Sequence, residues 1–128
     1  MSFPADVLYT YLSTYAGLIA LTSTRIYPVD GLEQCAKPYI VYAVISEIRH
    51  YCHGGYSNLS EYRVQISCYG DTLASARAVA DQVVTAMDAW PAANANVQAS
   101  FFENELYIFE ENTKLHHIPV DYKVAYGS

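Results

Sequence analysis

The segment from Glu61 to Trp90 changes its hydrophobic period once, and this change limits the folds that the chain can adopt. Up to Tyr69 apolar residues alternate with polar ones, which is typical of a strand with one buried face. After the turn at Gly70-Asp71 the apolar residues recur at helical spacing, and the opposite helix face is polar. A strand that leads directly into an amphipathic helix predicts a sheet with helices packed against it.

The ends of two helices are marked by residues with known terminal preferences. Pro4 suits the first turn of an N-terminal helix, and Gly17 is expected to mark its end, with a short further turn over residues 18–21. For the second helix we expect Asp71 as the N-cap and Pro91 as the stop, because proline lacks the N–H that a continuing helix needs.

Two segments between residues 25 and 48 indicate extended chain. Residues 25–28 form a short piece that ends at a proline, and residues 39–48 predict a strand that is apolar on both faces. Its alternating faces carry Tyr39, Val41, Ala43 and Ile45 on one side and Ile40, Tyr42, Val44 and Ile48 on the other. Such a strand has to be covered twice, by its own domain or by a neighbouring subunit.

The C-terminal third predicts three strands. Residues 97–103 and 106–110 are expected to form two of them, joined by a turn at Asn104-Glu105. Residues 118–126 form the last strand, in which Pro119 favours a sheet edge or the start of the strand. The predicted order is therefore α-β-β-α-β-β-β, an α+β domain with a mostly antiparallel sheet and two helices packed on one face. At 128 residues the chain is expected to be a single domain.

Residues 49–60 are expected to form a mobile loop between two antiparallel strands, because Gly54-Gly55 and the polar residues around them make the segment too long for a tight hairpin. The segment also contains the metal-ligand types His50, Cys52 and His53, but their spacing matches no standard zinc pattern. We therefore expect no metal and no cofactor. A small metal-binding enzyme that uses these three residues is the alternative from a different functional class.

Catalytic arrangements are missing elsewhere in the sequence. The chain has no Gly-x-Ser-x-Gly motif, and Cys68 and Trp90 fall on apolar faces, where we expect them in the core. His116 and His117 are adjacent in an expected strand and therefore point to opposite faces, so at most one could join a metal site. These observations predict a structural or interaction protein and not an enzyme.

The composition indicates contact with partners. Apolar residues make up 52% of the chain and charged residues only 16%, which is a thin charged coat for a monomer. Thirteen tyrosines fit an interface, where one end of the ring is dry and the other wet, although tyrosine also favours strands. The candidate assembly-interface residues are Tyr39, Tyr42, Tyr51, Tyr56, Tyr122 and Tyr126.

The charge and the cysteines exclude several classes of protein. A net charge of −6 argues against specific nucleic-acid binding, whereas an acidic wall would keep passing DNA from sticking. Three cysteines without CxxC spacing indicate reduced thiols in a protein made in a cytoplasm. The N-terminus has no signal-peptide pattern and no apolar run reaches membrane-spanning length, so no membrane partner is expected.

Three segments together resemble a known family. They are the N-terminal helix that leads through Leu18-Ile19-Ala20-Leu21 to Arg25-Ile26-Tyr27-Pro28, the strand entry at residues 37–42, and the strand-to-helix run from Tyr62 to Ala80. In order and spacing they are similar to the tail completion, or tail terminator, family of long-tailed bacteriophages and related prophage particles. The resemblance spans most of the chain and rests on the succession of the segments.

The resemblance implies a ring, typically of six copies, at the head-proximal end of a phage tail tube. Such a ring ends polymerisation of the tail tube protein and presents a surface to a neck or head-completion protein, with DNA only as passing cargo in the lumen. It implies a virion protein made in the host bacterial cytoplasm, and no family residue is catalytic. A neck or head-completion adaptor is the alternative within the same class, and an oligomeric binding module of bacterial origin is a further one.

Overall fold

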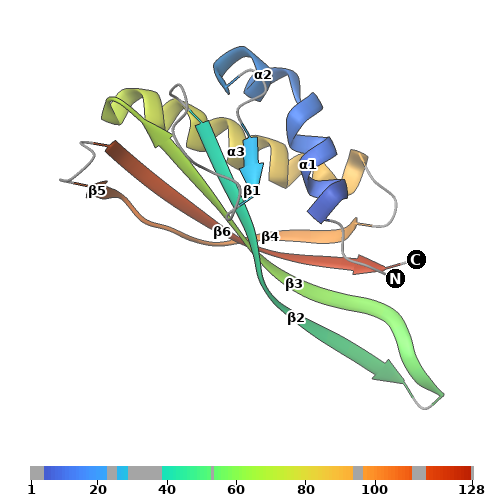
Figure 1. Ribbon diagram of the computed structural model, residues 1–128. Coiled ribbons are helices and arrows are strands. Elements are labelled where there is room, and N and C mark those ends of the chain that lie inside the picture. Colours follow the sequence, from blue (N-terminus) through green and yellow to red (C-terminus); the bar gives the residue numbers. More distant parts are fainter. Residues whose placement is uncertain are drawn as a thin grey trace.

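The computed structural model describes residues 5–22, 26–28, 39–52, 54–93, 97–110 and 115–127. Its elements are the helices α1 (Ala5–Thr14), α2 (Ala16–Thr22) and α3 (Leu73–Ala93), and the strands β1 (Ile26–Pro28), β2 (Tyr39–Cys52), β3 (Gly55–Gly70), β4 (Val97–Glu105), β5 (Ile108–Glu110) and β6 (Leu115–Gly127). The helices lie together on one side of a long, twisted sheet (Figure 1). No helix in these ranges is both long and apolar enough to cross a membrane.

The sheet has the order β1-β2-β3-β6-β4, with β5 also paired to β6. All pairs are antiparallel except β1 with β2, which is parallel. The predicted α+β class and the helices on one face are therefore confirmed. The predicted element order needs two changes, because α2 is a separate helix and the short piece at residues 26–28 joins the sheet as a strand, which makes the sheet mixed.

The core lies between the helices and the central strands β3 and β6. Their inward side chains are fully buried, as the strand-period part of the sequence predicts: Tyr62, Val64, Ile66, Cys68, Ile118, Val120, Tyr122 and Val124. Trp90 on α3 is 1% exposed and stacks on Tyr11 of α1 at 5.4 Å between ring centroids. The expectation that Cys68 and Trp90 belong to the core is confirmed.

The switch from strand to helix lies where the sequence places it, but the helix ends differ in detail. The cap is Thr72 and not Asp71, because the Thr72 hydroxyl accepts the Ser75 N–H at 3.1 Å. Pro91 lies inside the last turn of α3, which continues to Ala93. Gly70 allows the tight approach of strand and helix, since a Cβ there would lie 2.7 Å from the Ala76 nitrogen.

At the N-terminal end of the chain the predicted helix stop is also displaced. The first helix ends at Thr14, and Gly17 lies within α2 and not at a helix end. The N–H groups of Leu18 and Ile19 both bond the Tyr15 carbonyl, so a new helix begins directly after the break.

The strands β4 and β5 do not form the predicted hairpin at Asn104-Glu105. Instead both pair with β6, one after the other along the same side, and Glu105 is the last residue of β4. Pro119 lies opposite the break between them, in a central strand and not at an edge. Its carbonyl accepts the Leu106 N–H at 3.2 Å, so its missing N–H also falls on this side, where the neighbouring strand is interrupted.

The predicted loop at residues 49–60 is, in its described residues, the distal half of the β2–β3 hairpin. The backbone stays paired as far as Cys52 and Gly55, and the hairpin projects beyond the helices as an arm (Figure 1). Gly55 has φ 121°, a conformation that favours glycine and that suits a tight turn at the tip. The expectation of a long irregular connection is therefore wrong, while the expected mobility stays a prediction.

Candidate assembly interface

One cluster of exposed apolar residues lies on β2, where the arm leaves the body. Val44, Ile45 and Ile48 are 38%, 55% and 57% exposed, and we call residues 43–52 the β2 edge. Pairing with β1 ends at Tyr42, so within the described residues no strand lies on the outer side of the β2 edge. The strand predicted to be apolar on both faces is thus buried only in its first part, around Tyr39, Ile40 and Val41.

A bulge between Val44 and Ser46 changes which way the later residues of β2 point. Val44 is in register with the buried Val64 and so lies on the helix side, on the same face as Ile40 and Tyr42. Beyond the bulge the alternation is displaced by one residue. Ile48, which simple alternation places on the same face as Val44, is therefore on the helix-free face opposite Glu61.

A second exposed apolar cluster lies at the other side of the sheet, which we call the β4–β5 edge (residues 97–110). Among its described side chains the large exposed apolar residues are Phe101, Phe102, Leu106, Tyr107, Ile108 and Phe109. In the part of the chain that the structure describes, β4 and β5 pair only with β6. The sequence carries the signal, since residues 106–109 are consecutively apolar, but a hairpin was expected there and no interface.

The two edges lie at opposite ends of the same cross-strand rows. On the helix side one row runs Val44, Val64, Tyr122, Phe102, and its two inner members are completely buried. On the helix-free side a second row runs Ser46, Arg63, Lys123, Phe101. Each row therefore ends in an exposed phenylalanine at one edge and in an exposed residue of β2 at the other.

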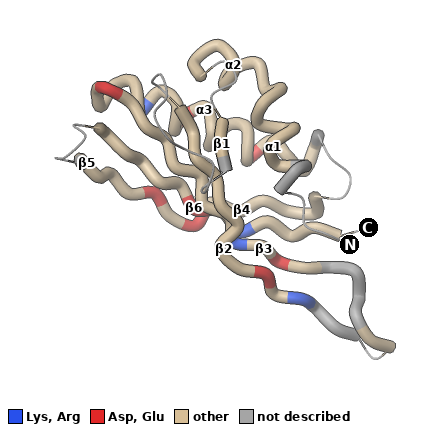
Figure 2. The backbone as a smooth tube through the Cα atoms, in the orientation of Figure 1, with Lys and Arg blue, Asp and Glu red and all other residues tan. Residues whose placement is uncertain are grey.

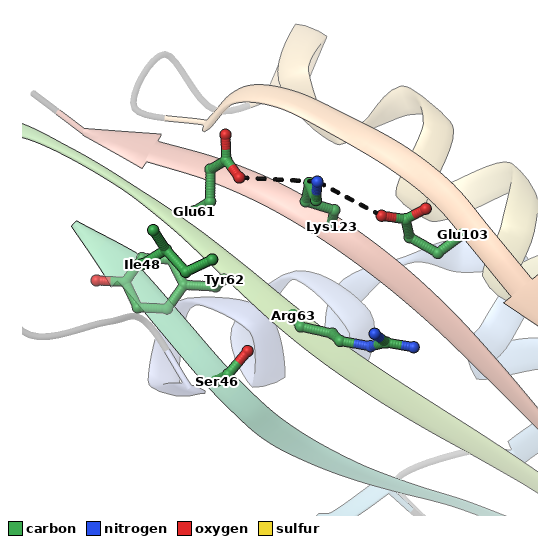
Figure 3. Close-up of a pocket in the computed structure, with 7 residues that line it drawn as sticks. All are labelled: Ser46, Ile48, Glu61, Tyr62, Arg63, Glu103 and Lys123. Carbon is green, nitrogen blue, oxygen red and sulfur yellow. Dashed lines mark ion pairs between the residues drawn. The ribbon is translucent and has the colours of Figure 1, made fainter. Parts of the chain in front are cut away.

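Between the edges, the helix-free face carries charges that neutralise one another. Lys123 lies 3.8 Å from Glu61 and 3.7 Å from Glu103, and Arg63 lies 3.1 Å from Asp121. Figure 3 shows Lys123 between the two glutamates, across an open pocket of about 250 Å³. These three ion pairs are partly solvent-exposed, so each is expected to contribute little to the stability of the fold.

The root of the arm is fixed by one carboxylate on the helix side. Glu47 accepts hydrogen bonds from Tyr62 at 3.1 Å, Ser60 at 3.2 Å and Arg49 at 3.2 Å. Loss of solvent raises the pKa of Glu47, but the bonds from Tyr62, Arg49 and Ser60 outweigh it, so the pKa is lowered. Figure 2 shows acidic and basic residues close together where β2 and β3 leave the body.

Two contacts hold the β4–β5 edge, one to the helix α3 and one to the strand β6. The Arg77 guanidinium of α3 donates to Glu105 at 2.7 Å, and this hydrogen bond raises the pKa of Arg77. Phe102 packs edge-on against Tyr122 with 5.7 Å between ring centroids. Strand β4, which carries Phe101 and Phe102, is therefore held both to α3 and to the core.

The six tyrosines selected from the sequence lie in three different environments. Tyr122 and Tyr126 point into the core, and Tyr122 donates to Asp88 at 2.9 Å, so their side chains hold the helix layer and offer little surface to a partner. Tyr39 is 6% exposed and stacks on Tyr69, whereas Tyr42 is half-buried near Tyr9. Tyr51 and Tyr56 pair with each other near the tip of the arm, and their side chains lie outside what the structure describes.

Aromatic rings form a ladder across the helix-free face at the end opposite the arm. Tyr39 stacks on Tyr69 at 4.7 Å, and Tyr69 stacks on His117 at 4.2 Å. His116 instead contacts Tyr107, whose hydroxyl lies 2.6 Å from its Nδ1. The adjacent histidines thus point to opposite faces, as predicted.

The residues of the metal alternative are not brought together by any described contact. His53 and the side chains of His50 and Cys52 lie outside the described part of the structure. Within that part, no three His, Cys, Asp or Glu side chains are grouped closely enough to hold a metal ion. Cys68 is a buried free thiol, and burial raises its pKa, so it does not form a thiolate readily.

Comparisons with known proteins agree with the architecture. The family model described as tail completion protein gp17 matches residues 6–127. A solved chain from the virion of a native gene transfer agent particle has a similar fold, with a TM-score of 0.78 and 18% sequence identity, over 99% of this chain and 100% of the other. Comparison with curated protein sequences gave no match. The chain therefore belongs to the tail completion protein gp17 family, and it is a structural protein of a phage-type tail.

Proposed function

We propose that the chain forms a ring at the head-proximal end of a tail tube, where it ends tube polymerisation and joins the tail to the head. Six copies are the expected number, and the tube protein and a neck or head-completion protein are the expected partners. The observation that carries this proposal is the pair of exposed apolar edges on opposite sides of one sheet in a chain of the tail completion family.

Opposite edges suit a ring for a geometric reason. A subunit that offers different surfaces on its two sides binds its neighbours head to tail, and such heterologous contacts close into a ring when the rotation allows it. The β4–β5 edge lacks the lysine, arginine and proline that often protect a sheet edge, since residues 97–110 contain none of them. Exposed apolar edges of this kind are expected to be covered in the assembled particle.

The arm and the acidic residues suggest two further roles within the ring. We propose that the arm reaches a neighbouring subunit or the tube, and deletion of residues 51–57 is then expected to disturb tail length or head joining. We also propose that acidic side chains facing the lumen keep DNA moving, so that Glu-to-Lys changes there slow DNA ejection. Tails of normal length that join heads after the deletion would contradict the role of the arm. Unchanged ejection kinetics would contradict the role of the acidic residues.

The proposal is tested by removing the gene and imaging the particles by negative stain. A terminator predicts overgrown tubes of variable length, and supplying the protein restores uniform length. Tails of normal length that fail to join heads would favour the alternative, a neck or head-completion adaptor. We also propose that the chain has no enzymatic activity. The alternative, a metal-binding enzyme, predicts bound metal that is lost when His50, Cys52 and His53 are substituted, and metal analysis of both proteins tests this.

A further inference from the structure

We propose that the β4–β5 edge of one copy pairs as a strand with the β2 edge of the next copy, so that the sheets of neighbouring subunits join into one sheet around the ring. The occupant of each edge is a second copy of this chain. The inference rests on the proposed ring and adds the contact that builds it.

Strand direction permits this contact without turning a subunit over. From β2 to β4 the sheet passes through three antiparallel steps, by way of β3 and β6, so β2 and β4 run in opposite directions. When a second copy is placed beside the first in the same orientation, its β2 is antiparallel to the first copy's β4. The new pair therefore continues the alternation of the sheet, and the helices of both copies stay on the same side.

The lengths of the two edges also match. The part of β2 that β1 leaves uncovered, residues 43–52, has about as many residues as β4, which has nine. Backbone groups on the outer side of such strands gain hydrogen bonds when a strand is added, which is the principle of strand augmentation. A ring closed in this way covers the outer side of β4 and of the part of β2 that β1 leaves free, as strand closure does in a barrel.

The side chains supply cover on both faces of the new pair. On the helix side, Phe102 of one copy comes beside Val44 of the next, because both belong to the row through Val64 and Tyr122. On the helix-free side, Phe101 comes beside Ser46 and Ile48. Phe101 and Ile48 are 59% and 57% exposed in the single chain, and aromatic–aliphatic pairs across antiparallel strands stabilise the pairing.

A cysteine experiment in assembled particles tests the pairing. Two double variants, Ser46→Cys with Phe101→Cys and Ile48→Cys with Phe101→Cys, are placed in a background with Cys35→Ser and Cys52→Ser. Within one chain the two edges are three strand spacings apart, roughly 14 Å, which is beyond the reach of a disulfide. The matched control is Ile48→Cys with Phe102→Cys, whose side chains lie on opposite faces of the sheet.

Mild oxidation of purified tails that contain the chain is expected to give a ladder of cross-linked species, up to the closed ring, for at least one double variant. The control and each single cysteine variant should give no ladder. Absence of a ladder in tails that contain the chain would overturn the edge pairing and leave the proposed function intact. Absence of the chain from the tails would overturn the proposed function, and oxidation of the concentrated free protein would then decide the pairing by the same ladder.

Discussion

The centre of the sheet and its two edges use the same kinds of residue in opposite ways. In the row from Val44 to Phe102, Val64 and Tyr122 are fully buried under α3, whereas the terminal Val44 and Phe102 are 38% and 49% exposed. The centre is completed by the chain's own helices. The edges carry large apolar side chains that stay exposed in the single chain, as the proposed contact between copies requires.

The largest expected loss of stability comes from the centre. Trp90→Ala removes a ring that is 1% exposed and stacked on Tyr11, and leaves a cavity between α1 and α3. Such a change is expected to lower the free energy of unfolding by about 3–5 kcal/mol. Urea denaturation followed by circular dichroism checks this, and a loss below about 1 kcal/mol would show that the helix layer is not the core.

A smaller loss is expected from the buried hydroxyl in the same region. Tyr122 donates to Asp88 at 2.9 Å, and burial together with that carboxylate raises its pKa, so the hydroxyl stays protonated and remains a donor. Tyr122→Phe keeps the ring and removes the hydrogen bond, with an expected cost of about 1–2 kcal/mol in the same denaturation experiment. An unchanged urea midpoint would mean that the hydrogen bond between Tyr122 and Asp88 adds nothing to the free energy of unfolding.

The root of the arm is expected to depend on pH. The folded-state pKa of Glu47 lies below its ordinary value of 4.5, so the stabilisation is present above pH 4.5 and is lost as the pH falls through the lower folded value. Glu47→Gln should therefore flatten the fall in thermal stability below pH 4.5 relative to the natural chain. The control is Asp81→Asn, an exposed carboxylate on α3. An equally steep fall of thermal stability in the Glu47 variant would show that Glu47 does not cause the pH dependence.

A substitution at the β4–β5 edge is expected to have the smallest effect on stability but to abolish assembly. Phe102→Lys adds charge to an exposed position and should change the unfolding free energy by less than about 1 kcal/mol. It should nevertheless prevent ring formation, as lysine does at protected sheet edges. Ile19→Lys on α2, at a residue that is 44% exposed, is the matched control. Rings formed by the Phe102 variant would show that the β4–β5 edge is not a contact between subunits.

The elements with uninterrupted periodicity could be predicted from sequence, and those set by distant pairing could not. The run from β3 into α3 follows directly from the change of period between Tyr69 and Leu73. The bulge after Val44, in contrast, leaves no mark in the local pattern, and it moves Ile48 to the other face. Similarly, β4 and β5 appeared to be hairpin partners because they are adjacent in sequence, although both pair with β6.

The candidate interface was found only in part. Apolar residues on both faces of β2 predicted a strand that needs cover, and Val44, Ile45 and Ile48 are exposed there in the single chain. Their cover by a neighbouring subunit stays a prediction. Tyrosine content was a poorer guide to the interface, because a tyrosine side chain such as that of Tyr122 can be buried and hydrogen-bonded within its own domain. Exposure depends on which strands end the sheet, and strand order is a property of the whole fold.

Amide hydrogen exchange on the free chain and on the chain in purified tails tests whether neighbouring sheets join, because strand pairing protects backbone N–H groups. We expect residues 43–52 and 97–105 to gain protection together on assembly, while α2 stays unchanged. Protection of both edges would support the joined sheet. Assembled tails in which neither edge, or only one of them, gains protection would contradict it.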